Sequence, residues 1–216
     1  MSIAPVEIER RKRILQAARH RLEHYGYEKT TMAEIAADAG MAVGSLYLHF
    51  HSKEDLLVAF AEECQERYLC ALERIAASDA PPSARLRELA RLRALAIKEQ
   101  LEATPHGGDV LLRMMKSGHI CCRRMEEREL GMIESILREG AARGEFAVPD
   151  PAQTARVFRS AFAGFMPPLS LGRPAAEVAR EVEALYSLLL RGLHCGEAER
   201  ASGSRAAVAG AAGERR

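Results

Sequence analysis

The sequence lacks the features that mark membrane proteins and secreted proteins. It contains no tryptophan, only 5% of its 216 residues are aromatic, and no segment approaches the roughly 18–20 consecutive apolar residues of a membrane span. The N-terminal segment becomes charged before any apolar run appears, which is unlike a secretion signal. We therefore expect a cytoplasmic protein with no membrane partner.

An excess of charge of either sign is also missing. The chain has 31 Lys and Arg residues against 30 Asp and Glu, a net charge of +1, so any basic surface for nucleic acid has to be local. The five cysteines are odd in number and irregularly spaced, which indicates mostly reduced thiols. No Ser/His/Asp set, glycine-rich phosphate loop or carboxylate pair stands out, so we expect neither an enzyme nor a cofactor.

What the sequence does contain is helical periodicity. Apolar residues recur at helical spacing and strand-like alternation is absent, which predicts an all-α fold of about nine helices, three short ones followed by a larger bundle. The expected helices cover residues 6–25, 31–38, 43–49, a long stretch from 53, and regions around 86–95, 110–117, 121–143, 157–165 and 178–193. The Ala- and Gly-rich tail has no large apolar anchor and is expected to be disordered.

Residues 31–49 have the pattern of a helix-turn-helix, in which two short helices are joined by a turn that contains glycine. The segment TMAE (31–34) has the form of a capping box, with Thr31 as N-cap and Glu34 three residues later. Gly40 suits a left-handed turn position. In this motif the second helix enters the major groove of DNA, so we expect residues 43–49 to read bases.

One face of that second helix suits a DNA duplex. At about 100° per residue, Val43, Gly44, Tyr47 and Leu48 share a face, whereas Leu46 points into the protein. Val43 can contact a thymine methyl, Gly44 leaves the backbone open to DNA, and the Tyr47 hydroxyl can reach a phosphate. The full set of expected DNA contacts is Thr30, Thr31, Ala42, Val43, Gly44, Ser45, Tyr47, Leu48, His49 and Lys53.

The segment TTMAEIAADAGMAVGSLYLHFHSKEDLL (30–57) resembles the DNA-binding signature of the tetracycline-repressor (TetR) family of bacterial transcription regulators. The resemblance covers about 50 residues, roughly Ile8 to Leu57. It implies that the N-terminal helices bind DNA and that the fourth helix connects them to a ligand-binding bundle. Ala42 departs from the family pattern, because many relatives have Ser or Thr there and alanine cannot cap a helix through its side chain.

With this resemblance, the sequence predicts a homodimeric repressor that binds a palindromic operator on double-stranded DNA and is released by a small-molecule effector. We expect a DNA-binding domain (1–53), a ligand-binding and dimerisation domain (54–198) and a disordered tail (199–216). The expected dimer residues are Val157, Phe158, Phe162, Val178, Leu185, Leu189 and Leu193. Alternatives from other classes are an enzyme and a helical interaction module without an operator, and the sequence does not distinguish a repressor from an activator.

The effector site is predicted only loosely. Its expected residues are Cys64, Met114, Met115, His119, Cys122, Met125, Phe162 and Phe165. An alternative is a metal-sensing or thiol-redox regulator, since His119 and Cys122 lie three residues apart and could be completed by Cys64 or His106. Two ligands do not make a metal site, so we favour buried or bystander roles for these residues and expect no metal.

Overall fold

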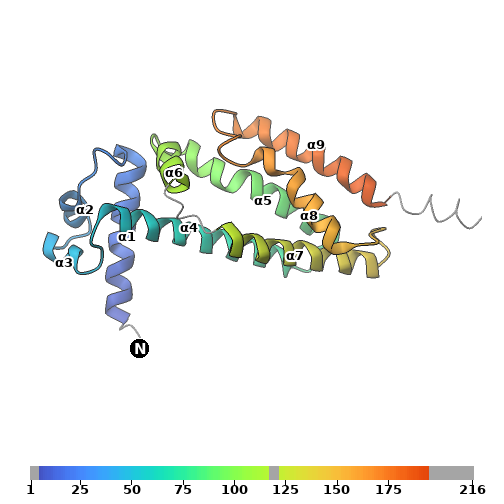
Figure 1. The fold of residues 1–216 in the computed structure, drawn as a ribbon, viewed down its shortest axis with the longest axis horizontal. Helices are drawn as coiled ribbons and strands as arrows, with labels where there is room; N and C mark the ends of the chain where they lie inside the picture. The colour runs from blue at the N-terminus through green and yellow to red at the C-terminus, as the bar shows by residue number, and fades with distance from the viewer. Residues whose placement is uncertain (1–4, 117–121, 195–216) are drawn as a thin grey trace, which may run out of the picture. The chain divides into compact units, whose positions relative to one another are not determined.

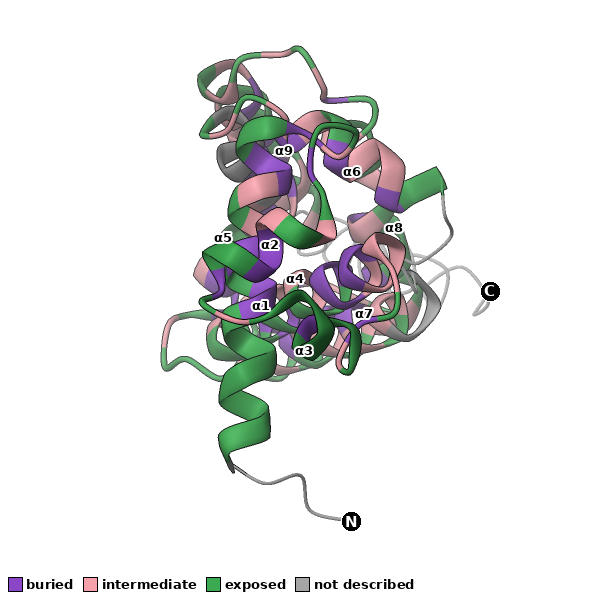
Figure 2. Ribbon diagram, turned by 90° about the vertical axis from the view of Figure 1, so that its left-hand side faces the viewer, coloured by how far each residue is buried: buried purple, intermediate pink, exposed green. Residues whose placement is uncertain are grey.

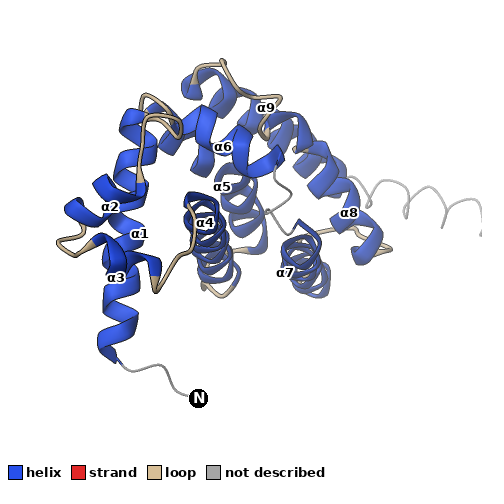
Figure 3. Ribbon diagram, turned by 60° about the vertical axis from the view of Figure 1, so that its left-hand side comes forward, coloured by secondary structure: helices blue, strands red, loops and turns tan. Residues whose placement is uncertain are grey.

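A computed structural model describes residues 5–116 and 122–194, and every regular element in them is helical (Figure 3). The elements are α1 (Pro5–Tyr25), α2 (Met32–Asp38), α3 (Val43–Tyr47), α4 (Lys53–Ala76), α5 (Pro82–Glu102), α6 (Gly107–Lys116), α7 (Cys122–Ala142), α8 (Pro151–Ala161), the short 3₁₀ helix η1 (Ala163–Phe165) and α9 (Ala175–His194). The predicted all-α fold is confirmed. None of the described helices is long and apolar enough to cross a membrane. The expected disordered tail lies outside the described residues.

The helix boundaries follow local capping signals. Gly26 and Gly40 have φ angles of +85° and +67°, so α1 and α2 end at left-handed positions that glycine adopts without strain. The α8 helix begins six residues before the predicted apolar stretch, because the side chain of Asp150 accepts a hydrogen bond from the N–H of Gln153 at 2.9 Å. Pro151 then occupies the first helical position, where its missing N–H costs nothing.

The chain divides into two compact units. The first comprises residues 1–70 and 96–125 and the second comprises residues 71–95 and 126–216. In the first unit, one buried cluster joins α1, α2, α3 and the start of α4; it includes Ile14, Ile35, Leu46, Phe50 and Leu56. A second cluster joins the end of α1 to α4 and α6, and it includes Leu22, Leu57, Phe60, Val110 and Met114. Helix α6, which lies beside the end of α1 in Figure 1, therefore shares a core with α1 and α4.

The second unit is built from part of α5 with α7, α8 and α9. Its buried apolar residues include Leu86, Leu89, Ile133, Ile136, Leu137, Phe158, Phe162, Val178 and Val182. Two polar contacts hold its helix ends: the Tyr186 hydroxyl donates to the carbonyl of Ser83 at 2.5 Å, and Arg85 Nη1 donates to the carbonyl of Ala76 at 2.9 Å. Ala76 is the last residue of α4, so the contact from Arg85 satisfies a carbonyl that a helix C-terminus leaves without a partner.

A glycine in α7 tests the packing of this second unit. A Cβ at Gly140 would lie less than 3.0 Å from the ring of Phe146, which is itself buried. We expect Gly140→Ala to destabilise the protein by about 1–3 kcal/mol, because the ring has to shift. Gly131→Ala in the same helix, where a Cβ would meet no atom within 4 Å, should instead stabilise it by about 0.5–1 kcal/mol. Urea unfolding of both variants measures the difference, and equal midpoints would contradict this packing.

Candidate nucleic-acid interface

Helix α3 is held by two buried side chains and by its own backbone. Leu46 is fully buried and Phe50, just beyond the helix, is nearly so; both belong to the cluster that contains Ile35 of α2. The N-cap residue Ala42 makes no side-chain hydrogen bond, as expected, and its carbonyl accepts from the N–H groups of Ser45 and Leu46 at 2.9 and 3.2 Å. A helix this short depends on tertiary packing, because an isolated one is unstable in water.

The opposite face of α3 is open to solvent. Val43 keeps 39% of its surface exposed, Tyr47 keeps 44% and Leu48 keeps 83%, and most of α3 is coloured as exposed in Figure 2. A Cβ at Gly44 would meet no atom within 4 Å. The exposed face that the helical spacing predicts is therefore confirmed, and its contact with DNA stays a prediction. Its apolar groups can contact thymine methyls, and the bare backbone at Gly44 allows close approach.

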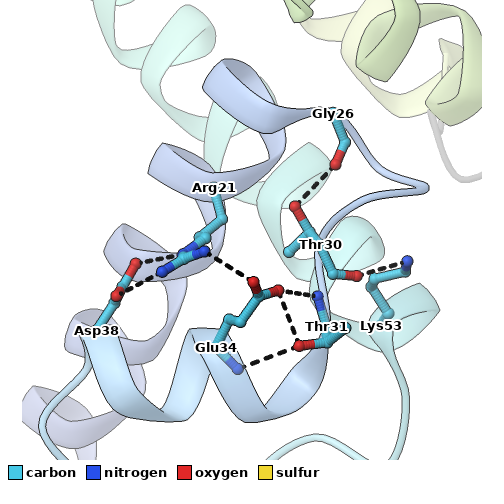
Figure 4. A network of polar contacts seen from close by, with 7 residues as sticks. All are labelled: Arg21, Gly26, Thr30, Thr31, Glu34, Asp38 and Lys53. Atoms are coloured by element: carbon cyan, nitrogen blue, oxygen red, sulfur yellow. Dashed lines mark hydrogen bonds and ion pairs between the residues drawn. The ribbon is translucent and has the colours of Figure 1, made fainter.

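The two threonines before α2 have different surroundings. Thr31 is exposed and forms the predicted capping box: its Oγ1 accepts from the N–H of Glu34 at 3.3 Å, and Glu34 Oε2 accepts from the N–H of Thr31 at 2.9 Å (Figure 4). Thr30 is buried, and its hydroxyl donates to the carbonyl of Gly26 at 2.7 Å. The expected contact between the Thr30 hydroxyl and DNA is therefore incompatible with the structure.

Arg21 fixes α1 against α2. Its Nε and Nη2 donate to the two carboxylate oxygens of Asp38 at 2.6 and 3.0 Å, and its Nη1 pairs with Glu34 at 3.2 Å (Figure 4). The hydrogen bond from Arg21 lowers the pKa of Asp38, and the hydrogen bonds from Thr31 lower the pKa of Glu34. Because both pKa values are depressed in the folded state, these contacts stabilise it at neutral pH and are lost as the pH falls through them.

Two basic residues at the edge of α3 are engaged inside the protein. The side chain of His49 is largely buried, with Nδ1 3.1 Å from Glu7 Oε1 of α1. The Nζ of Lys53, at the start of α4, donates to the carbonyls of Tyr27 and Thr30 at 2.5 and 2.8 Å. These contacts correct the expectation that both side chains are free for DNA phosphates. They also remove the need for a phosphate to offset the Lys53 charge at the helix N-terminus.

Comparison with known families agrees with this geometry. Residues 14–60 match the bacterial regulatory proteins of the tetR family, and residues 82–185 match the tetracyclin repressor-like C-terminal domain. The two matches together span more than half of the chain. The chain belongs to the TetR family. The predicted family and the predicted DNA-binding transcriptional regulator are thereby confirmed.

Individual TetR-family relatives are similar over parts of the chain. A transcriptional repressor of Mycobacterium tuberculosis is 37% identical over 65 residues, which is 30% of this chain and only 35% of that protein. The fatty acid metabolism regulator protein of Bacillus subtilis is 26% identical over 141 residues, covering 61% of this chain and 68% of the relative. A TetR/AcrR-family regulator of Thermobifida fusca superposes with a TM-score of 0.65 at 27% identity, covering 85% of this chain and 98% of that structure. All three relatives are described as regulators or repressors.

In this TetR-family chain, α6 docks on the loop between α1 and α2, a contact for which the sequence contains no local signal. The Arg113 guanidinium of α6 lies 3.9 Å from the centroid of the Tyr27 ring and pairs with Glu28. Lys53 Nζ lies 4.0 Å from the same centroid, and the Tyr27 hydroxyl donates to Glu54 Oε2 at 2.5 Å. Burial and the bond to Glu54 raise the pKa of Tyr27 to about 12. The neutral ring thus connects α6 to the start of α4.

The residues expected to line an effector site are divided between the two units. In the first unit, Cys64 and Met114 belong to or pack against one buried cluster, whereas Met115 is exposed, which corrects its assignment to a pocket. Met125 is half-buried. In the second unit, the rings of Phe162 and Phe165 lie 6.2 Å apart. His119 and the side chain of Cys122 lie outside the described residues.

The metal-sensing or thiol-redox alternative finds no support in the described structure. Within residues 5–116 and 122–194, no group of three or more His, Cys, Asp and Glu side chains could hold a metal ion. Burial raises the pKa of the Cys64 thiol, although its Sγ accepts from Arg67 at 3.3 Å, and a raised pKa makes a thiol less reactive. The ring of His106 packs against Gly26, and its Nδ1 lies 3.7 Å from Asp109.

Three of the expected dimer residues belong to the core of the second unit instead. Phe158, Phe162 and Val178 are buried, because α8 and α9 turn these residues inward at helical spacing. Val157 remains 53% exposed, and Leu188, which the spacing argument does not include, is 59% exposed. The other expected residues, Leu185, Leu189 and Leu193, are half-buried. Val157 on α8 and Leu188 on α9 are therefore the exposed large apolar residues of these two helices.

A substitution at Gly44 separates the effect on DNA binding from the effect on protein stability. Gly44→Ala should stabilise the protein by about 0.5–1 kcal/mol, since alanine favours the helix and its methyl group meets no protein atom. If DNA lies against this position, the same methyl should weaken operator binding about tenfold. Thermal unfolding and fluorescence anisotropy with labelled duplex measure the two effects. Gly131→Ala serves as the control, and unchanged DNA affinity in Gly44→Ala would place the DNA elsewhere.

The contact between Arg113 and Tyr27 should restrain the loop before α2. Arg113→Gln removes the cation from the ring and breaks the pair with Glu28, which should destabilise the loop by about 1 kcal/mol. Hydrogen exchange of the amides of residues 26–31 should then accelerate about fivefold. Arg138→Gln, which breaks an exposed pair with Glu134 in α7, should leave these amides unchanged. Equal exchange in the two variants would show that α6 does not restrain the loop.

Proposed function

We propose that this chain is a homodimeric transcriptional repressor that binds a palindromic operator through α3 and is released by a small-molecule effector. One observation carries the DNA-binding part: α3 presents Val43, Tyr47 and Leu48 around an open glycine, while Leu46 anchors its other face. In this proposal residues 1–53 bind DNA, residues 54–198 bind the effector and the second subunit, and the protein acts in the cytoplasm. A twofold dimer presents two such helices to successive major grooves, about 34–36 Å apart.

The proposed mode of base reading is mainly apolar. Val43 and Leu48 have no hydrogen-bonding side chains, and Ala42 leaves only backbone groups at the start of the helix. Tyr47 supplies a hydroxyl on the same exposed face, within reach of a phosphate. Thr31 is exposed as well, with its hydroxyl also bonded to Glu34 at 2.8 Å. We therefore expect specificity to depend on thymine methyls and DNA shape more than on bidentate hydrogen bonds.

Helix α6 supports a route for effector control. It falls within the part of the chain that matches the C-terminal family domain, yet it shares a buried cluster with α1 and α4. A displacement of α6 would act on the Tyr27 ring through Arg113, and from there on Glu54 at the start of α4. An effector that favours the displaced position of α6 would thereby favour a different orientation of α3. The coupling free energy in such systems is typically about 1–3 kcal/mol.

Selection of duplexes from a random DNA pool tests the function directly, and a palindromic consensus is expected. On that consensus, Tyr47→Phe should weaken binding about threefold to tenfold, because one hydrogen bond to a phosphate is lost, and should leave the slope of log affinity against log salt unchanged, because no charge is removed. Tyr25→Phe is the matched control, since Tyr25 is equally exposed but lies on α1. Recovery of no preferred sequence would refute the repressor proposal, whereas wild-type affinity in Tyr47→Phe would refute only the contact.

The proposed dimer uses the exposed apolar residues of α8 and α9. Val157→Glu or Leu188→Glu should shift the monomer–dimer equilibrium toward monomer by at least about a hundredfold, because each would place an unpaired charge in the interface. Leu169→Glu provides the control, since Leu169 is 70% exposed in the segment before α9. Sedimentation velocity gives the oligomeric state. A dimer that survives both substitutions would exclude this face as the interface.

A further inference from the structure

The second unit contains a group of four charged side chains that the proposed DNA contacts do not use. Arg93 of α5, Glu126 and Glu129 of α7, and Arg159 of α8 form this charge cluster. Arg93 Nη1 donates to both carboxylate oxygens of Glu129 at 2.7 and 2.5 Å. Arg159 donates from Nε to Glu129 at 3.0 Å and from Nη1 to Glu126 at 2.7 Å. The side chains of Arg93 and Glu129 are only 10% and 4% exposed.

Stability alone does not account for the charge cluster. Removing charges from water carries a desolvation cost, and apolar side chains of similar volume often stabilise a core as well or better. In addition, Nε of Arg93 is buried and has no hydrogen-bond partner in the part of the chain that the structure describes. A buried donor without an acceptor destabilises the fold, so an acceptor supplied from outside is favoured at this point.

The geometry of Arg93 indicates which acceptor fits. Both of its hydrogen bonds to Glu129 leave from Nη1, at the end of the guanidinium group away from Nε. The edge formed by Nε and Nη2 is one that arginine offers to a carboxylate in two parallel hydrogen bonds. Arg159 also donates to Glu129, so that carboxylate keeps a charged partner when Arg93 turns toward a ligand.

The helices that carry the charge cluster are apolar one turn away from it. Ala90 on α5, Ile133 on α7 and Phe162, the C-cap residue of α8, each lie three or four residues from a member of the charge cluster, and all three are buried. Residues at this spacing share a helix face. The helix faces beside the charge cluster are therefore apolar, and they would suit a ligand with an apolar body.

From these observations we propose that the charge cluster is the polar end of the effector site and that the effector is an amphipathic carboxylate whose carboxyl group binds Arg93. The proposal rests on the effector-controlled function proposed above. It names a ligand class, a molecule with one ionised carboxyl group on an apolar body, and a specific anchoring residue. An uncharged molecule of the same shape would leave the Arg93 edge without an acceptor.

The test compares carboxylates with matched alcohols on the full-length protein at pH 7.5. Octanoate is paired with 1-octanol, and phenylacetate with 2-phenylethanol; binding is measured by calorimetry and by the shift in unfolding temperature. At least one carboxylate should bind ten times more tightly than its alcohol. Arg93→Gln should reduce that preference tenfold or more, because it removes the charge and the paired donors. If this variant does not fold, Arg93→Lys keeps the charge, loses the paired geometry and should also lose most of the preference.

Arg85 supplies the matched control. It is a buried arginine in the same unit, its Nε also lacks a partner, and it pairs with Glu139 of α7. Its Nη1 already donates to the carbonyl of Ala76 and its Nη2 already pairs with Glu139. Arg85 therefore cannot offer Nε and Nη2 together to a ligand carboxylate. Arg85→Gln should therefore keep the carboxylate preference of the wild type. An equal loss in both variants would show a structural effect and overturn the proposal.

Other results also overturn the proposal: no binding of either carboxylate, equal binding of the alcohols, or an unchanged preference in the Arg93 variants. Release of the selected operator duplex is measured separately from ligand binding. Carboxylates that bind through Arg93 without releasing DNA would support the site and contradict effector control. Release by compounds that bind independently of Arg93 would support effector control and contradict the site.

Discussion

The orientation of α3 depends on the burial of Leu46 and Phe50 against the first two helices. A helix from Val43 to Tyr47 is too short to be stable alone, and its N-cap alanine adds no side-chain bond. The hydrophobic contacts with Ile35 and the rest of that cluster therefore set both its position and the direction of its exposed face. The face that Val43, Gly44, Tyr47 and Leu48 present to solvent is a consequence of where the anchor residues point.

The polar groups around α3 mainly hold its neighbours in place. Arg21 fixes α2 against α1, Lys53 bonds the loop before α2 to the start of α4, and His49 pairs with Glu7. The sequence predicts DNA contacts for His49 and Lys53, since a positive charge near a recognition helix suits a phosphate. Backbone carbonyls and carboxylates from distant segments occupy them instead. Helix α1 carries exposed basic residues, among them Arg10, Lys12 and Arg13. Their positive charge suits a long-range attraction to DNA.

The contacts within the two units bear on how effector binding is coupled to DNA binding. Helix α6 shares a buried cluster with α1 and α4 and carries the arginine that lies over the Tyr27 ring. Arg85 and Arg93 of the second unit are largely buried, and among the residues that the structure describes the Nε of each has no hydrogen-bond partner. In the first unit the apolar contacts and the charge contacts reinforce one another. In the second, the largely buried pair Arg93 and Glu129 is a cost to folding that a ligand carboxylate would offset.

Local signals in the sequence were sufficient for the helices, the capping box at Thr31 and Glu34, the glycine turns and the exposed face of α3, because each depends on residues within a few positions of one another. Periodicity alone does not separate core residues from surface residues on α8 and α9. It places Phe158 and Val178 in an interface, whereas the structure buries both in the core. It also leaves out Leu188, which the structure exposes. The partners of Thr30, His49, Lys53 and Tyr27 lie 4 to 86 positions away in the chain. Only tertiary packing brings most of these groups together, since a side chain's hydrogen-bond and charge partners depend on three-dimensional proximity rather than on sequence spacing.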